Sequence, residues 1–100
     1  MRTALTERLG IEAPIIQGSL GPWTSVPLTA AVCEAGALGT LGTAIRSGEQ
    51  VRADIAALRE RTARPFAVNH TLRPFSGEAW DATLAESPPV VSLALGHRPD

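Results

Sequence analysis

Polar residues and glycines follow each of four apolar runs in this chain. The four groups are Gln17-Gly18-Ser19, Gly42-Thr43, Asn69-His70, and Ser92 with Gly96-His97. If the runs are parallel strands, their carboxyl ends meet at one face, where α/β folds bind their ligands. These side chains and glycine backbones suit hydrogen bonding to a polar heterocycle. A second interpretation stays open, in which strand ends are polar because they meet water.

Other site chemistries are poorly represented in the sequence. His70 and His97 have no nearby acidic or cysteine partner, so we expect no metal site. Ser19 stands in no nucleophile elbow and has no evident base. The glycines of residues 36–42 fall within a predicted strand, whereas a dinucleotide fingerprint lies between strand and helix. All nine basic residues are arginines, which excludes lysine chemistry within these residues.

Length and composition indicate one small domain. The chain has 100 residues, of which 44% are hydrophobic, and a formal net charge of −1. This balance favours neither nucleic acid nor a membrane surface as a partner. The single cysteine, Cys33, lies in an alanine-rich helical pattern and is predicted to be a buried small hydrophobe. With no secretory signal or long apolar run in the sequence, we expect a soluble protein of the reducing cytoplasm.

The elements that must position the polar groups alternate along the chain. Apolar spacing, capping residues, glycines and prolines predict helices at residues 3–10, 26–35, 48–62 and from residue 76 to the Pro88-Pro89 pair. Apolar runs, three of them rich in β-branched or aromatic residues, predict strands at 15–18, 38–43, 66–70 and 90–95. The order βαβαβαβ indicates a parallel sheet with helices packed outside. We expect the inner face of this sheet to carry Ile16, Leu41, Val68 and Val91.

Several sequence blocks resemble the N-terminal portion of the nitronate monooxygenase family, formerly called 2-nitropropane dioxygenases. They occur in the family's order and spacing, and they are Leu5-Thr6-Glu7 to Leu9-Gly10-Ile11, Pro14-Ile15-Ile16-Gln17, Ala30-Ala31-Val32 with Ala35-Gly36-Ala37-Leu38-Gly39, Pro65-Phe66-Ala67-Val68-Asn69, and Pro88-Pro89-Val90-Val91-Ser92. The resemblance implies a (β/α)₈ TIM barrel that binds FMN at the carboxyl ends of its strands. Such a flavoprotein oxidises alkyl nitronates with dioxygen, and similar blocks occur in flavin-dependent enoyl and quinone reductases.

The same resemblance implies which residues meet the flavin. The loop after the first strand would lie against the flavin ring, and the asparagine after the third strand would hydrogen-bond it. The implied cofactor-binding residues are therefore Gln17, Gly18, Ser19, Leu20 and Asn69. The family usually has Ala-Pro-Met where this chain has Gly18-Ser19-Leu20, which loosens the loop. His70, the residue after Asn69, stands where the family more often has an apolar residue. It either reaches the flavin or substrate or has a surface or packing role.

The length of the chain limits what it is expected to do alone. A (β/α)₈ barrel needs about 250 residues, so residues 1–100 correspond to a partial FMN-binding barrel domain, its N-terminal half. The family's phosphate-binding loops and catalytic histidine come from later strands, and no catalytic residue is assigned here. One hypothesis is an FMN-dependent oxidoreductase seen as its N-terminal half. The other is a non-catalytic half-barrel or truncated remnant, inactive alone, that pairs with a second copy or another chain.

Overall fold

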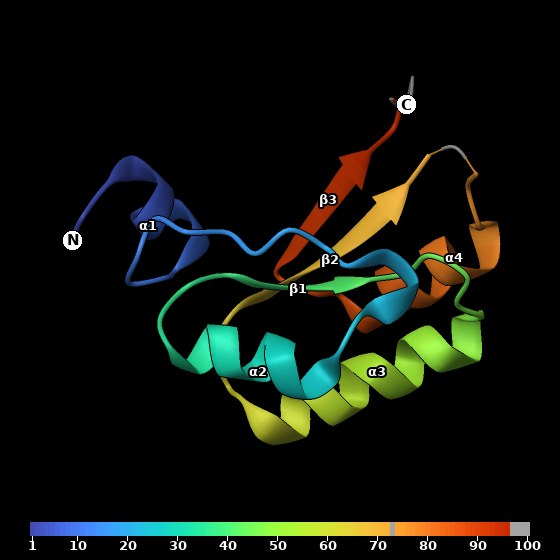
Figure 1. The fold of residues 1–100 in the computed structure, drawn as a ribbon, viewed down its shortest axis with the longest axis horizontal. Coiled ribbons are helices and arrows are strands. Elements are labelled where there is room, and N and C mark those ends of the chain that lie inside the picture. The colour runs from blue at the N-terminus through green and yellow to red at the C-terminus, as the bar shows by residue number, and fades with distance from the viewer. Residues whose placement is uncertain (73, 97–100) are drawn as a thin grey trace.

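The computed structural model describes residues 1–72 and 74–96, so the predicted role of His97 lies outside the described residues. Three parallel strands lie side by side in the order β1-β2-β3, with helices between them in sequence (Figure 1). The elements in chain order are α1 (Ala4–Leu9), the 3₁₀ turn η1 (Gly21–Trp23), α2 (Val26–Glu34), β1 (Gly39–Gly42), α3 (Gly48–Arg61), β2 (Phe66–Thr71), α4 (Gly77–Glu86) and β3 (Val90–Ala94).

The helices begin where short polar residues satisfy their first free N–H groups. Ser47 accepts a hydrogen bond from the Gln50 N–H, and the Gln50 side chain accepts one from the Ser47 N–H, which is a capping box for α3. Ser76 caps α4 with a single hydrogen bond, which its side chain accepts from the Ala79 N–H. These local signals confirm the helix predictions to within one or two residues.

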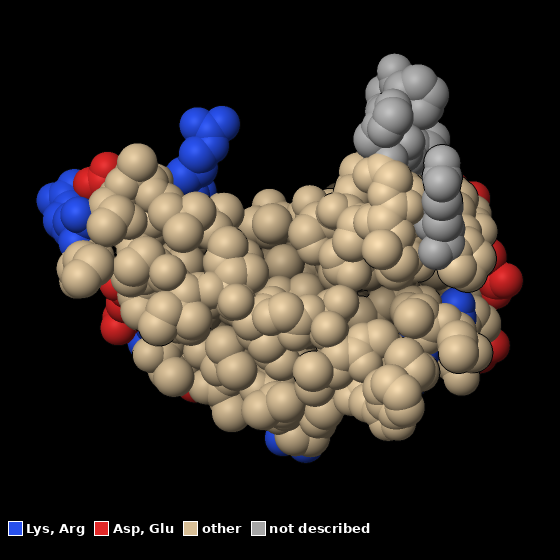
Figure 2. All heavy atoms as spheres, turned by 45° about the horizontal axis from the view of Figure 1, so that its top comes forward, with Lys and Arg blue, Asp and Glu red and all other residues tan. Residues whose placement is uncertain are grey.

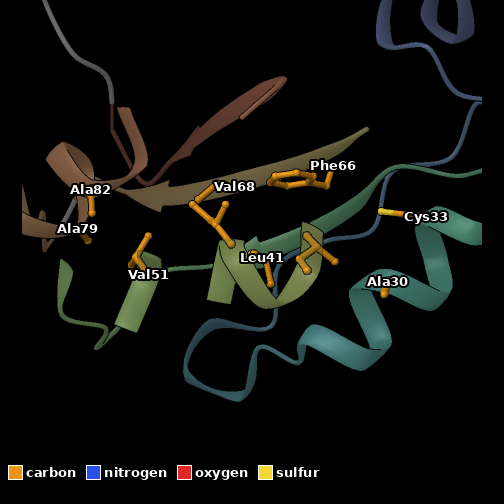
Figure 3. Packing of buried hydrophobic residues seen from close by; sticks show 10 residues of the cluster. Ala30, Cys33, Leu41, Val51, Phe66, Val68, Ala79 and Ala82 are labelled. Carbon is orange, nitrogen blue, oxygen red and sulfur yellow. The ribbon is translucent and has the colours of Figure 1, made fainter. Parts of the chain in front are cut away.

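Helices α2, α3 and α4 cover one face of the sheet, which we call the helix face (Figure 1). Figure 3 shows the side chains that fill the space between the two layers. The buried core on this face consists of Ala30, Cys33, Leu41, Val51, Ile55, Leu58, Phe66, Val68, Ala79 and Ala82. The prediction that Cys33 is a buried hydrophobe is confirmed, and burial raises the pKa of its thiol.

The opposite face of the sheet, which we call the open face, carries the alternate residues of each strand. At its amino end Leu38 and Ala67 are buried against Ile11, with Leu9 and Val90 packed beside them. Leu41 and Val68 belong to the helix-face core, and Val91 is paired in register with Val68 and shares its face. The predicted inner-face set is therefore wrong for these three residues. Alternation alone does not tell which of the two faces the helices cover.

The predicted strand at residues 15–18 is also wrong. This segment makes one isolated parallel bridge to β1, between Ile16 and Leu38. Beyond the bridge, side chains rather than a main chain bind the edge of β1. Gln17 Oε1 accepts a hydrogen bond from the Thr40 N–H at 3.1 Å, and Thr24 Oγ1 accepts one from the Gly42 N–H at 2.8 Å. The segment can therefore leave the sheet after Gln17 without exposing unpaired groups on β1.

Candidate functional site

Three polar side chains are joined on the open face of the sheet, where Asn69 lies in the second half of β2 and Ser92 lies at the centre of β3. Asn69 Nδ2 donates a hydrogen bond to Ser19 Oγ at 3.0 Å, and Asn69 Oδ1 accepts one from Ser92 Oγ at 2.7 Å. Asn69 and Ser92 are register partners. Asn69 lies two residues after Ala67 in β2 and therefore shares its face, the open face. We call these three residues the Ser19–Asn69–Ser92 network. It brings two of the sequence-predicted cofactor residues, Ser19 and Asn69, into contact.

The other predicted cofactor residues are arranged differently. The carboxamide of Gln17 is engaged with the Thr40 N–H at the edge of β1, where it replaces a main-chain partner. Gly18 is exposed, and a Cβ built there meets no atom within 4 Å, so open space borders this part of the loop. Leu20 is 44% exposed. The structure therefore places the Gly18–Leu20 loop beside Asn69, and gives Gln17 a structural contact of its own.

Two further polar groups of the open face were not among the cofactor residues that the family resemblance implies. Ser92, which the sequence places among the polar residues after the apolar runs, is the third member of the network. Thr40 is buried on the open face, in register with Ala67, and its Oγ1 has no hydrogen-bond partner among the described residues. Because buried hydroxyls ordinarily have partners, this orphaned group marks a polar environment that the chain itself leaves incomplete.

His70 points to the helix face and away from the Asn69 side chain. Its Nδ1 lies 3.1 Å from Thr43 Oγ1 and its Nε2 lies 2.9 Å from Thr83 Oγ1, and its ring meets the Trp80 ring edge-on. The side chain is buried, and burial lowers the pKa of its imidazole. Of the two roles left open by the sequence, the structure shows the packing role.

Acidification is expected to destabilise the chain through His70. Burial lowers the pKa of His70 from its ordinary value of 6.5, so the unfolded state takes up a proton at a higher pH than the folded state. The contribution of neutral His70 is complete above pH 6.5 and is lost as the pH falls towards the lower pKa of the fold. Urea unfolding at about pH 7.5 and about pH 5.5 measures this loss.

The variant His70→Gln is the control for this pH dependence. Glutamine keeps a hydrogen-bonding side chain but does not titrate, so the part of the pH dependence due to His70 should disappear. An equally steep loss of stability in His70→Gln would assign the effect to other groups.

Charge is sparse at the centre of the face seen in Figure 2. Figure 2 shows arginine and acidic side chains gathered around the margins of the view, with an uncharged centre. Among the described residues, no three His, Cys, Asp or Glu side chains form a group that could hold a metal ion. No helix in the described part of the chain is long and apolar enough to cross a membrane.

Comparisons with known proteins agree with this architecture. FabK from Thermotoga maritima superposes with a TM-score of 0.89 at 37% sequence identity, over 96% of this chain and 31% of that chain. Nitroalkane oxidase from Streptomyces ansochromogenes superposes with a TM-score of 0.77 at 30% identity, over 94% of this chain and 36% of that chain. The predicted fold class is confirmed, since the chain is a parallel α/β portion of a TIM barrel.

Comparison of the sequence with known proteins shows the family to which the chain belongs. A Mycobacterium tuberculosis protein named (3aS,4S,5R,7aS)-5-hydroxy-7a-methyl-1-oxo-octahydro-1H-indene-4-carboxyl-CoA dehydrogenase is 35% identical over 98% of this chain, which spans 28% of that protein. A nitronate monooxygenase from Paraburkholderia phytofirmans is 40% identical over 68% of this chain and 19% of its own length. The family model for nitronate monooxygenase matches residues 2–97. The chain therefore belongs to the nitronate monooxygenase family.

Proposed function

We propose that the chain supplies the first part of an FMN-dependent oxidoreductase, with the Ser19–Asn69–Ser92 network at the edge of the flavin ring. The observation that carries this proposal is the network itself, on the face of the sheet that the helices leave open, with Asn69 two residues before the carboxyl end of β2. TIM barrels bind their ligands at the carboxyl ends of their strands. A carboxamide offers both a donor and an acceptor, which suits the mixed edge of a flavin ring. When bound, FMN would supply the electron transfer.

The surroundings of the network fit a flavin ring. Open space borders Gly18, so a flat ring can approach the loop backbone closely. Thr40 is paired in register with Ala67, two residues before Asn69, and its buried hydroxyl has no partner among the described residues. In this arrangement Asn69 would hold and orient the ring, the bonds from Ser19 and Ser92 fix the Asn69 carboxamide, and exposed Leu20 would offer the ring an apolar side chain.

Two substrate classes follow from the relatives. An alkyl nitronate, oxidised with dioxygen, is the first candidate, because the family model spans residues 2–97. A fused-ring carboxyl-CoA thioester, whose dehydrogenation FMN would support when bound, is the second. The second is favoured by the length of the match, because the relative with that name aligns with 98% of this chain and the nitronate monooxygenase with 68%.

Further strands are needed to complete the barrel around this site. The free edge of β3 would pair with a strand from the rest of the barrel, or from a second copy of the chain. FMN titration with size-exclusion chromatography separates the two hypotheses. Stoichiometric yellow protein at the size of a dimer supports a flavin site completed by a second copy. A colourless aggregate supports the non-catalytic half-barrel.

Removing the carboxamide of Asn69 should weaken FMN binding. Asn69→Ala is expected to cost about 1–2 kcal/mol, about five- to thirtyfold in Kd, because a buried polar partner is left unpaired. Quenching of flavin fluorescence measures the affinity. The matched control is Gln50→Ala, which removes a carboxamide that caps α3 away from the network. Equal affinity in Asn69→Ala and the unmodified chain would remove Asn69 from the proposed site.

A further inference from the structure

The main chain of Asn69 is bound by a side chain at the point where β1 ends. Gly42, the last residue of β1, is the register partner of Asn69, and Thr43 is the next residue along the chain. Thr43 Oγ1 donates a hydrogen bond to the Asn69 carbonyl oxygen at 2.9 Å. Thr43 is 7% exposed, so water has little access to this bond. A hydroxyl group therefore continues the pairing of β2 beyond the end of β1 and fixes the Asn69 peptide.

The same hydroxyl also meets the imidazole ring of His70. The Thr43 oxygen lies 3.1 Å from His70 Nδ1, and His70 Nε2 lies 2.9 Å from Thr83 Oγ1 on α4. Thr83 Oγ1 in turn lies 2.9 Å from the Ala79 carbonyl oxygen. His70 and Thr83 are both buried. A continuous series of polar groups therefore runs from α4 through the ring and the Thr43 hydroxyl to the Asn69 carbonyl.

This series joins four pairs of atoms at hydrogen-bond distance, but it holds only three protons. Each of the two threonine hydroxyls supplies one proton. Burial lowers the pKa of His70 below its ordinary value of 6.5, so at about pH 7.5 the ring is neutral and has one proton on its two nitrogens. The position of the ring proton therefore decides which pair of atoms is left without a hydrogen bond.

The two positions of the ring proton have different consequences for Asn69. With the proton on Nε2, the bare Nδ1 draws the Thr43 proton away from the Asn69 carbonyl. With the proton on Nδ1, the ring donates to Thr43 Oγ1, and the Thr43 proton stays on the bond to Asn69. The pair then left without a proton is Thr83 with the Ala79 carbonyl, which already accepts a main-chain bond within α4.

The observed distances agree with a proton on Nδ1. The separation of 3.1 Å between His70 Nδ1 and Thr43 Oγ1 lies within the range for an N–H donor and an oxygen acceptor. The separation of 2.9 Å between Thr43 Oγ1 and the Asn69 carbonyl lies within the range for a hydroxyl donor. Both bonds can therefore exist together only when the ring is the donor to Thr43.

We propose that Thr43 and His70 are positioning residues for Asn69, which they hold through its carbonyl group. The ring, protonated on Nδ1, orients the Thr43 hydroxyl toward the Asn69 carbonyl on the helix face. That bond fixes the peptide from which the Asn69 carboxamide projects to the open face. The inference rests on the proposed function, because a carboxamide that holds a flavin ring must be oriented. His70 stands where the family more often has an apolar residue, so the arrangement is a feature of this chain.

The ring proton of His70 can be located on the 100-residue chain without FMN. Protonated and bare imidazole nitrogens give well-separated NMR signals, so a nitrogen spectrum at about pH 7.5 identifies the tautomer. We expect the proton on Nδ1. A proton on Nε2 in the unmodified chain would overturn the proposal, and this measurement needs no variant.

Substitutions of the two threonines test the link to Asn69. Thr43→Val removes the hydroxyl with little change in size, so the ring proton should move to Nε2, where Thr83 accepts it, and the carboxamide signals of Asn69 should shift. Thr43→Ser restores the hydroxyl and should return both sets of signals to their original positions. The matched control is Thr83→Val, which removes the other hydroxyl beside the ring. It should leave the proton on Nδ1 and the Asn69 signals in place.

Two results with these variants would contradict the proposal. One is an equal shift of the Asn69 carboxamide signals in Thr43→Val and Thr83→Val, which would assign the effect to a general loss of packing around His70. The other is a failure of Thr43→Ser to restore the signals that Thr43→Val displaces. The FMN titration of Asn69→Ala is a separate measurement, so failure of the flavin site and failure of the positioning role are distinguishable.

Discussion

Gly39→Ala should lower the free energy of unfolding by about 3 kcal/mol, at the upper end of the cost of overpacking a core. Gly39 lies on β1 directly beneath α2, and a Cβ there would overlap the Thr29 carbonyl oxygen and lie 2.7 Å from Cys33 Sγ. The carbonyl oxygen belongs to the helix backbone, so it cannot move without moving α2. The close approach of helix and strand therefore requires glycine at this position. Urea unfolding monitored by circular dichroism measures the loss.

Gly18→Ala is the matched control for this substitution. A Cβ at Gly18 meets no atom within 4 Å, so the same chemical change adds no overlap. We expect its unfolding free energy to stay within about 0.5 kcal/mol of the unmodified chain. If the two variants lost equal stability, the cause would be the entropy of the glycine backbone, and tight packing of α2 on β1 would be contradicted.

Leu41→Ala should cost about 3 kcal/mol, within the range for a leucine removed from a packed core. Leu41 is buried on the helix face among Val51, Ile55 and Val68, so truncation leaves a cavity that these side chains cannot fill. For a domain whose total stability is about 5–15 kcal/mol, this loss is large. Thermal and urea unfolding of the two proteins provide the measurement.

This substitution also tests which face of the sheet Leu41 occupies. If Leu41 faced an incomplete barrel interior, truncation would remove exposed apolar surface and leave the stability nearly unchanged. The control is Leu93→Ala, since Leu93 also lies in a strand but is 44% exposed. A loss in Leu41→Ala no larger than that in Leu93→Ala would contradict the helix-face assignment.

The helices were predictable because their signals are local. The exchange of hydrogen bonds between Ser47 and Gln50 lies within one turn, and the same residues that suggest the start of α3 make it. The strands β1 to β3 were predictable to within one or two residues, because apolar runs bounded by glycine and proline have few other solutions in a short chain.

The first predicted strand failed because its pairing depends on residues distant in sequence. Ile15 and Ile16 have the composition of a strand, yet Gln17 and Thr24 bind the N–H groups of β1 that a strand would have bound. A side-chain amide or hydroxyl replaces a main-chain carbonyl at little cost, and no local pattern distinguishes the two arrangements.

The candidate site was partly predictable. That Asn69 and the loop after residue 17 lie at the same end of the sheet follows from the parallel order of the strands. That Ser19 and Ser92 both bond the Asn69 carboxamide depends on the strand register and on the path of the loop. The left-handed backbone conformation of Ile45 has no sequence signal, because an isoleucine at such a position looks like any other apolar residue.

The sequence by itself determined the alternation of elements, the parallel fold and the end of the sheet toward which the candidate site lies. These properties follow from short-range periodicity, from capping and from the right-handed connection of parallel strands. The tertiary structure alone decided which face the helices cover, that His70 packs away from the site, and that Gln17 completes an edge. These outcomes depend on which of two chemically equivalent partners lies within reach, and only packing brings such partners together.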